Sequence, residues 1–251
     1  MSVKYKLNPK YANEFKEFLL DIKDNFLKND QSIHNARNQL KVIPFNGVET
    51  VVKAFRIPNI INQFAYAYIR DSKAKKSFEN AMKLVSKNVN TPEPIGYIEF
   101  HEKGLLKKSF FISLKQEYEF TLAHIRDEQP VYKDEVLNSF AKFTFEVHKK
   151  GILHSDYSGG NVLVKKENDT YAFSLVDINR MKFKIIENYK GLENFNKFWF
   201  NKEDLTTIAK SYAQVANLDM NKSIHEIIQY DRRLKEFVEN RRKWKKRLLG
   251  K

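Results

Sequence analysis

Three polar side chains in the second half of the sequence have the types and the spacing that phosphoryl transfer requires. Asp156 and Asn161 lie in the stretch His-Ser-Asp-Tyr-Ser-Gly-Gly-Asn, and Asp177 ends a later apolar run, Ser-Leu-Val-Asp. A carboxylate can accept the proton of an attacking hydroxyl, and amide and carboxylate oxygens are ligands that Mg²⁺ prefers. The pattern therefore predicts Asp156 as the general base and Asn161 with Asp177 as the metal ligands.

The same stretch matches the order H-x-D-x-x-x-x-N, which is found in the catalytic loop of protein kinases and precedes a metal-holding Asp. His154 occupies the first position, and we expect it to hold the loop rather than to take part in the chemistry. An amphipathic helix predicted over Lys133–Lys149, ended by Gly151, would present Asp156 on a rigid support. The alternative is an ordinary polar turn, because Asp, Asn, Ser and Gly are common turn residues.

Two residues of the first half could neutralise and orient nucleotide phosphates. Lys53 lies in a strand predicted over residues 50–55, in the run Thr-Val-Val-Lys, which resembles the V-A-I-K pattern. Glu79 lies in a helix predicted over residues 73–86, where kinases carry the acid that pairs with this lysine. Each has a simpler alternative, namely an outward-facing strand lysine and an exposed helical acid beside neighbouring lysines. A glycine-rich phosphate loop is missing, since residues 31–40 contain no glycine.

The apolar patterning predicts an α+β fold with two lobes like those of protein kinases. We expect a five-stranded antiparallel N-terminal lobe over residues 1–116 and a mainly helical C-terminal lobe over residues 117–251, with the nucleotide between them. Strands are predicted at 39–45, 50–55, 95–100 and 109–114, with a fifth just before the Asn-Gly hairpin that joins the first two. Helices are predicted around 11–28, 59–70, 73–86, 133–149, 203–215 and 223–249.

The composition indicates a folded protein and is compatible with a reducing compartment. The 251 residues include 20 Phe and 12 Tyr, which disfavours disorder, and no cysteine, which excludes disulfide frameworks and thiolate metal sites. The N-terminus lacks the apolar core of a secretory signal. No apolar run approaches the ~18 residues that a spanning helix needs. We therefore expect a cytoplasmic protein.

The net charge of +14 predicts an anionic partner. Between residues 231 and 251, ten Lys or Arg stand against three acids. Trp244 and Leu248 lie among these cations in the last predicted helix, a pattern typical of a helix in a membrane interface. The equally weighted alternative is a final lobe helix with a solvated charged face. Attachment to the anionic cytoplasmic face of the inner membrane therefore stays open, and no nucleic acid is expected because no binding motif for it is present.

Five segments resemble the lipopolysaccharide core kinase family, which phosphorylates Kdo or heptose sugars, and in particular its Bacteroidetes-type members. They are residues 51–62, 71–81, 90–100, 154–164 and 176–181, and the resemblance extends over roughly residues 33–181. The phrase Asp177-Ile-Asn-Arg-Met, which replaces Asp-Phe-Gly, is more specific than the general kinase pattern. The resemblance implies a protein-kinase-like fold, ATP with Mg²⁺, and a hydroxyl of a lipid-linked core oligosaccharide as the acceptor.

Carried over to this sequence, the resemblance implies Asp156 as the base, and Asn161 with Asp177 as the metal ligands. It implies that Lys53 and Glu79 together bind the nucleotide phosphates. It adds Arg180, which would contact the acceptor or, as we favour, brace the loop. Two departures stand out. Gly159 occupies a position where related sequences often have proline, which we expect to loosen the loop, and no arginine precedes Asp156, which disfavours control by a phosphorylated activation loop.

Two other functions share these catalytic residues or this fold. An atypical protein serine/threonine kinase would use the same residues, although no A-P-E-like segment follows Met181. A catalytically inactive kinase fold that serves as a binding module is disfavoured, because all five polar residues expected of an active kinase are present.

Overall fold

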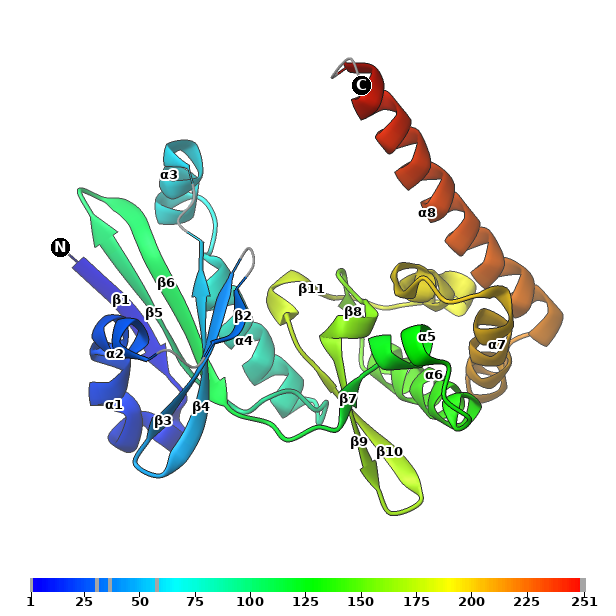
Figure 1. The fold of residues 1–251 in the computed structure, drawn as a ribbon, viewed down its shortest axis with the longest axis horizontal. Helices are drawn as coiled ribbons and strands as arrows, with labels where there is room; N and C mark the ends of the chain where they lie inside the picture. The colour runs from blue at the N-terminus through cyan, green and yellow to red at the C-terminus, as the bar shows by residue number, and fades with distance from the viewer. Residues whose placement is uncertain (1, 30–31, 36–37, 57–58, 249–251) are drawn as a thin grey trace. The chain divides into compact units, whose positions relative to one another are not determined.

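The computed structural model describes residues 2–29, 32–35, 38–56 and 59–248, and Figure 1 traces the chain. The chain forms two compact units. The first comprises Met1–Glu117 together with Asp177–Arg180, and the second comprises Tyr118–Val176 together with Met181–Lys251. The sequence suggested a single division between residues 116 and 117, whereas here the short segment Asp177–Arg180 groups with the first unit. Asp177 therefore belongs to the same unit as Lys53.

An antiparallel sheet of six strands, in the order β1-β5-β6-β4-β3-β2, forms the centre of the first unit. The strands are β1 (Ser2–Leu7), β2 (Ser32–Asn35), β3 (Gln39–Phe45), β4 (Val48–Phe55), β5 (Pro94–Glu102) and β6 (Leu105–Leu114). The five predicted strands are present, and β1 adds a sixth beside β5. Five of the six side chains of β1 are exposed. Apolar patterning therefore could not find this strand, which is defined by the pairing of its backbone.

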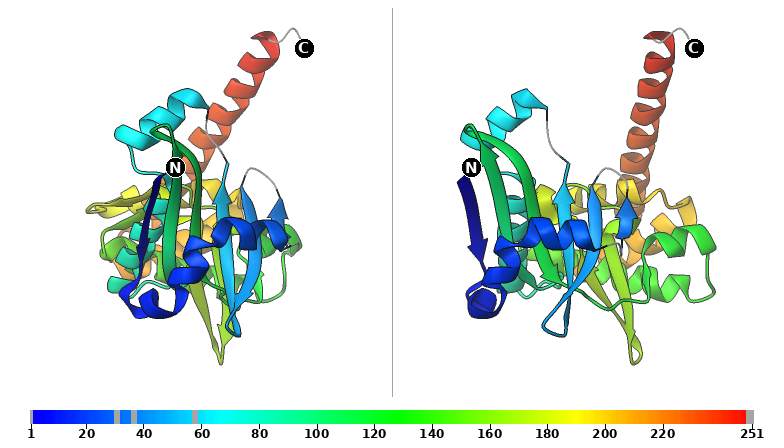
Figure 2. Two further views of the ribbon diagram at one scale, coloured as in Figure 1. Left: turned by 90° about the vertical axis from the view of Figure 1, so that its left-hand side faces the viewer. Right: turned by 60° about the vertical axis from the view of Figure 1, so that its left-hand side comes forward.

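Helices cover both faces of this sheet. The predicted helix over residues 11–28 is split at Asp21 into α1 (Ala12–Leu20) and α2 (Ile22–Lys28), which cross one face (Figure 2). There Phe26 packs on Phe110, with ring centroids 5.4 Å apart. On the other face, Phe78 of α4 (Lys73–Ser86) packs on Tyr97 at 5.6 Å. The short elements η1 (Pro9–Tyr11), α3 (Ile60–Tyr68) and η3 (Ile178–Arg180) complete this unit.

The second unit is mainly helical, as predicted. Its helical elements are α5 (Ala123–Glu128), α6 (Lys133–Lys149), η2 (Gly159–Asn161), η4 (Asn188–Phe198), α7 (Lys202–Ala216) and α8 (Met220–Leu248). Its strands are β7 (Phe120–Thr121), β8 (Ile152–His154), β9 (Val162–Glu167), β10 (Thr170–Leu175) and β11 (Met181–Phe183). β9 and β10 form an antiparallel hairpin, and β8 pairs with β11.

The core of the second unit is centred on Phe140 of α6. Its ring lies 5.5 Å from Tyr157, 5.6 Å from Phe173, 5.7 Å from Phe195 and 5.1 Å from Phe198. These rings come from the loop after β8, from β10 and from η4. Aromatic pairs at such distances stabilise a core beyond the burial of their area, so one side chain of α6 holds three separate segments together.

Helix α8 is the last described element. Its first half packs on α7 and η4 through Ser223, Ile227 and Asp231, whereas its last turns are exposed. None of the helices in the described part of the chain, including the 29 residues of α8, has a stretch long and apolar enough to cross a membrane.

A buried histidine joins η4 to α6 and α7. His148 Nδ1 lies 2.9 Å from the Tyr212 hydroxyl, and its Nε2 lies 3.1 Å from Asn194 Oδ1. The amide oxygen can only accept, so Nε2 carries the ring proton and the Tyr212 hydroxyl donates to Nδ1. Gly191 is required beside this pair, because a Cβ there would lie 2.1 Å from the Tyr212 oxygen. Burial lowers the pKa of His148 to about 4.

This lowered pKa predicts that the protein loses stability in mild acid. The unfolded chain binds a proton at His148 near pH 6.5, whereas the folded chain resists protonation until about pH 4. The unfolded state then binds more protons between these values, so the free energy of unfolding falls as the pH falls, by up to about 3 kcal/mol. Urea unfolding at pH 7, 6 and 5 measures this loss. His148→Gln should flatten the pH dependence, and His225→Gln, at an exposed position of α8, should leave it unchanged.

Candidate active site

Lys53 lies on the face of β4 opposite Val52 and Ala54. These two neighbours are buried in the core formed with α1 and α2. Side chains alternate along a strand, so Lys53 points to the opposite face, where α4 packs. Its side chain is 14 % exposed, and its ammonium forms an ion pair with the carboxylate of Asp177. The structure thus brings together two predicted site residues that are 124 positions apart in the chain.

Asp177 is held by its own short segment and by α4. Its backbone has a φ of 53°, in the left-handed region that few residues other than glycine adopt. The side-chain amide of Asn179 donates a hydrogen bond of 2.8 Å to Asp177 Oδ1. The amide of Asn80, on α4, donates one of 2.7 Å to the carbonyl of Ile178. Asn179 therefore holds the carboxylate itself, and Asn80 holds the backbone of the segment that carries it.

Glu79 does not join this pair. Its carboxylate lies 3.8 Å from Lys75 Nζ, which also binds Asp71 at 2.7 Å. Among the residues that the structure describes, no ion pair links Glu79 to Lys53, so the predicted partnership is not formed. Helix geometry gives the reason. Phe78 faces the sheet, and the next residue is turned from it by about 100° around the helix axis.

His154 holds the loop that carries Asp156. Its ring is 1 % exposed and stacks on Tyr157 at 5.7 Å. Nδ1 accepts a hydrogen bond of 3.1 Å from the backbone N–H of Asp156. The ring proton is therefore on Nε2, which donates to the carbonyl of Val176 at 3.0 Å. A neutral imidazole thus links the loop to Val176, the residue that precedes Asp177 in the chain.

Asn161 closes the same loop. Its side-chain nitrogen donates a hydrogen bond of 2.9 Å to the carbonyl of Asp156, and its own carbonyl accepts one of 3.0 Å from the N–H of Val176. The amide nitrogen is engaged with the loop backbone, so the side-chain oxygen is directed away from that carbonyl. This oxygen is the atom that Mg²⁺ would bind, and the arrangement therefore fits a metal ligand.

Gly159 is closely packed against the start of α5. It is buried under α5, and a Cβ at this position would lie 2.7 Å from Ala123 Cα and 2.8 Å from Ala123 N. Backbone atoms cannot give way easily at such distances. Glycine is therefore needed here because the start of α5 approaches the loop backbone directly.

Two residues of η4 that the sequence did not reveal also contact this loop. The side-chain amide of Asn194 donates a hydrogen bond of 3.0 Å to the carbonyl of His154. Lys197 Nζ donates one of 2.6 Å to the carbonyl of Ser155 and lies 3.4 Å from Asp156 Oδ1. No spacing rule connects η4 with the loop. The available signal was the alternation of polar residues with Phe in the run Asn-Phe-Asn-Lys-Phe, which predicts only an amphipathic segment.

Each unit carries part of the chemistry that the sequence predicted. The first unit offers an ammonium and a carboxylate, and the second offers the Asp156 carboxylate beside a lysine. Arg180 ends η3 and is exposed, so its bracing role stays a prediction. Within the described ranges, no group of three or more His, Asp or Glu side chains could hold a metal ion by itself.

The fold is similar to those of known kinases. A structure of WaaP in complex with acyl carrier protein matches with a TM-score of 0.64 and 12% identity, covering 93% of this chain and 98% of that one. The Rio2 kinase-ADP/Mg²⁺-phosphoaspartate complex from Chaetomium thermophilum matches with a TM-score of 0.48 and 13% identity, covering 90% and 71%. WbdD with a kinase inhibitor matches at 0.45 and 13%, covering 79% and 44%. No curated protein sequence matches the chain.

The predicted α+β, two-lobed kinase-like fold is therefore confirmed by the first of these matches. The sequence also matches the model of the lipopolysaccharide kinase (Kdo/WaaP) family over residues 59–221, more than half of the chain. The matched region contains Asp156 and Asn161 with the loop that His154 anchors, and it contains Asp177. By this match, the chain belongs to the lipopolysaccharide kinase (Kdo/WaaP) family.

Proposed function

We propose that this kinase uses ATP and Mg²⁺ to phosphorylate a hydroxyl of a Kdo or heptose sugar in the inner core of lipopolysaccharide. The observation that carries the proposal is the anchored loop of Asp156 inside the region matched by the family. Phosphoryl transfer asks little covalent help from the protein, because its transition state is loose. A fixed carboxylate, a fixed amide and fixed cations are therefore sufficient machinery.

In this proposal, Asp156 accepts the proton of the sugar hydroxyl. Asn161 and Asp177 would hold Mg²⁺ through their side-chain oxygens, and the ion would supply positive charge to the nucleotide phosphates. Lys53 neutralises the nucleotide phosphates. The role of Glu79 as a partner of Lys53 stays a proposal, because Glu79 is paired with Lys75 in this structure. The ion pair of Lys53 with Asp177 supports these roles, since it fixes both side chains in one unit before any ligand arrives.

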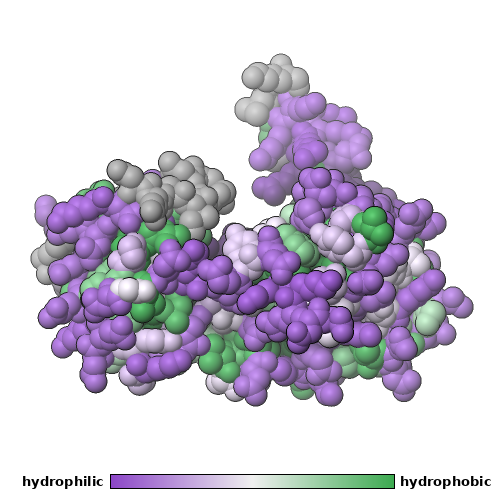
Figure 3. Space-filling model, turned by 60° about the horizontal axis from the view of Figure 1, so that its bottom comes forward, coloured by the Kyte–Doolittle hydropathy of each residue, from purple (hydrophilic) through white to green (hydrophobic). Residues whose placement is uncertain are grey.

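We further propose that α8 attaches the protein to the anionic surface that presents its lipid-linked acceptor. Phe237, Trp244 and Leu248 are 62%, 62% and 64% exposed. At 100° per residue they fall within about 40° of one another around the helix, so they form one apolar stripe. The face of the last turns of α8 that Figure 3 shows is mostly hydrophilic.

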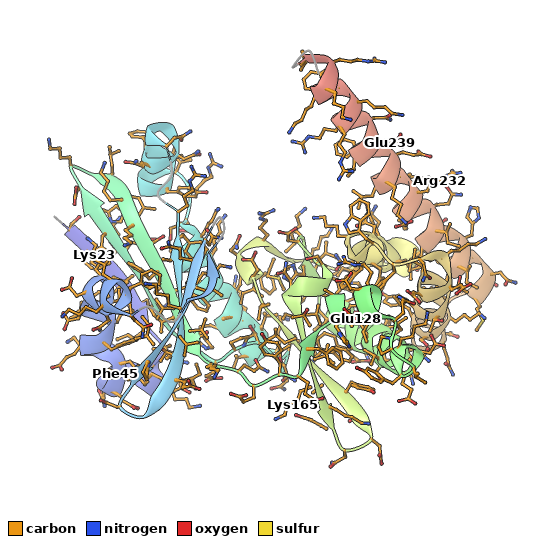
Figure 4. The ribbon with its side chains drawn as sticks, in the orientation of Figure 1. Lys23, Phe45, Glu128, Lys165, Arg232 and Glu239 are labelled. Atoms are coloured by element: carbon orange, nitrogen blue, oxygen red, sulfur yellow. The ribbon has the colours of Figure 1, made fainter. Side chains whose placement is uncertain are left out.

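The charge of the same turns complements such a surface. Residues 241–247 contain six Lys or Arg, and no acid follows Glu239. Earlier on the helix, acids and bases alternate and pair, as between Arg232 and Glu236 at 3.7 Å and between Lys235 and Asp231 at 2.6 Å. Of the six later cations, Lys243 pairs with Glu239 at 2.7 Å. Figure 4 labels Arg232 and Glu239 on this helix. An apolar stripe among unbalanced cations is typical of a helix that lies in a lipid interface.

Deleting the gene should remove one phosphate from the lipopolysaccharide inner core, and mass spectrometry of the extracted lipid measures this loss. A wild-type copy should restore the phosphate, whereas a copy with Asp156→Ala should not. Unchanged lipopolysaccharide in the deletion strain would contradict the proposal. Loss of a phosphoprotein in place of the lipid phosphate would favour the alternative of a protein serine/threonine kinase.

Two variants should separate the proposed base from the proposed metal ligand. Asp156→Ala removes the proton acceptor, so the purified protein should lose turnover while its dissociation constant for ATP with Mg²⁺ stays nearly unchanged. Asp177→Ala removes a metal ligand and should weaken the Mg²⁺-dependent binding of ATP. Calorimetric titration of ATP, with and without Mg²⁺, measures the dissociation constants of both variants, and an assay of phosphate transfer measures their turnover. Near-wild-type turnover in Asp156→Ala would show that the base is assigned to the wrong residue.

Binding to lipid vesicles should depend on the end of α8. Each cation near an anionic surface contributes about 1 kcal/mol, so Arg241→Gln, Arg242→Gln and Lys245→Gln together should weaken binding to phosphatidylglycerol vesicles about 100-fold. The same three changes at residues 232, 233 and 235, where two of the cations are already in ion pairs, serve as the matched control and should weaken it less. Equal binding to phosphatidylcholine vesicles, or selective binding to a protein such as the acyl carrier protein seen with WaaP, would argue against the membrane assignment.

A further inference from the structure

A lysine from outside the catalytic loop lies against the proposed base. Lys197 Nζ is 3.4 Å from Asp156 Oδ1 and donates a hydrogen bond of 2.6 Å to the carbonyl of Ser155. The two ionised side chains are 40% and 31% exposed, so both are accessible from solvent. Asp156 and Lys197 are 41 positions apart in the chain, and their meeting is a result of the fold.

The loop itself has no cation to offer. Residues 154–161 contain neither Lys nor Arg. His154 is neutral, because its Nδ1 accepts the N–H of Asp156 while its Nε2 donates to a carbonyl. The positive charge beside Asp156 therefore comes from Lys197 of η4. None of the predicted catalytic residues lies in this segment.

The backbone around Lys197 is rigidly placed. Phe195 and Phe198, on either side of it in sequence, are buried and pack on Phe140. Asn194 binds the carbonyl of His154, which fixes η4 directly to the loop. A charge held in place before the reaction stabilises a transition state more than one that must be moved into position.

We propose that Lys197 is a catalytic residue that contacts the transferred phosphoryl group as well as Asp156. This inference rests on the proposed function, in which Asp156 accepts the proton of the acceptor hydroxyl. A general base lies about 3 Å from the oxygen that it deprotonates, and that oxygen lies about 3 Å from the phosphorus that it attacks. An ammonium in contact with the base is therefore within reach of the phosphoryl oxygens.

The step that Lys197 assists is a simple displacement. The acceptor oxygen forms a bond to the γ-phosphorus, the bond from that phosphorus to the bridging oxygen breaks, and the electron pair stays on ADP. The proton of the acceptor passes to Asp156. Negative charge is spread over the three equatorial oxygens of the phosphoryl group as this occurs, and the Lys197 ammonium offsets it while its contact with Ser155 keeps it in place.

The chain has no cysteine, which allows a direct test of the charge at this position. Lys197→Cys places one thiol in the protein. Its thiolate displaces bromide from 2-bromoethylamine and becomes a lysine analogue with a thioether in the side chain. With iodoacetamide, the thiolate displaces iodide and becomes a neutral side chain that ends in an amide. The two products separate the role of the ammonium from that of side-chain bulk.

We expect kcat for Lys197→Cys to fall by about 10²–10³-fold, the usual effect of removing one preorganised charge stabiliser. The dissociation constant for ATP should change little. Aminoethylation should restore most of the rate, and carbamidomethylation should not. The wild type treated with each reagent controls for reaction elsewhere. Lys190→Cys, in the same segment but paired with Glu193 at 2.5 Å, should keep the wild-type rate before and after alkylation.

Phosphate transfer to the lipid-linked sugar and hydrolysis of ATP by water are both measured. The proposal about the acceptor and the proposal about Lys197 can then be contradicted independently of each other. A wild type that hydrolyses ATP but does not phosphorylate the sugar contradicts the proposed acceptor, and hydrolysis then still tests Lys197. A near-wild-type rate in Lys197→Cys overturns the assignment of Lys197. Equal rescue by both reagents also overturns it, because that result assigns Lys197 a packing role. Rescue by the amine alone supports it.

Discussion

The catalytic loop depends on one buried, neutral imidazole. His154 accepts the N–H of Asp156 through one nitrogen and donates to the carbonyl of Val176 through the other. A protonated ring would present a donor to the N–H of Asp156, so the geometry requires the neutral form. Stacking on buried Tyr157 keeps water away from this arrangement. The position of the carboxylate and the end of the β9–β10 hairpin are thereby linked by a single side chain.

The segment η4 extends this link into the helical core. Asn194 donates to the carbonyl of His154 and accepts from His148, whose other nitrogen meets the hydroxyl of Tyr212. A continuous set of hydrogen bonds therefore runs from α7 through α6 and η4 to the loop. Buried polar networks of this kind rigidify a site when every member is satisfied. Gly191 is part of this arrangement, because the space that its missing Cβ leaves is filled by the Tyr212 hydroxyl.

The first unit holds a lysine and a carboxylate together in a partly exposed position. Lys53 is placed by the alternation of β4, and Asp177 by a left-handed backbone and by donors from its own segment. Glu79 was expected here and is instead turned toward Lys75. The sequence position of Glu79 predicts the direction of its side chain only when the packed face of the helix is known. Phe78 defines that face, because it packs against the sheet.

The sequence by itself determined the parts of the protein that local chemistry controls. The order of the elements, several helix bounds, the Asn-Gly hairpin and the types of the polar residues in the loop all followed from patterns within about ten to twenty residues. It also carried the family, through motifs that are contiguous in the chain.

The tertiary structure alone decided which distant groups meet. The edge strand β1 exists because its backbone pairs with β5, although its side chains give no apolar signal. Lys197 reaches Asp156 because rings from η4 and from the loop after β8 pack together on Phe140. Ala123 lies against Gly159, 36 positions further along the chain. Such contacts depend on the shapes of packed surfaces far apart in sequence, and residue spacing along one segment does not contain that information.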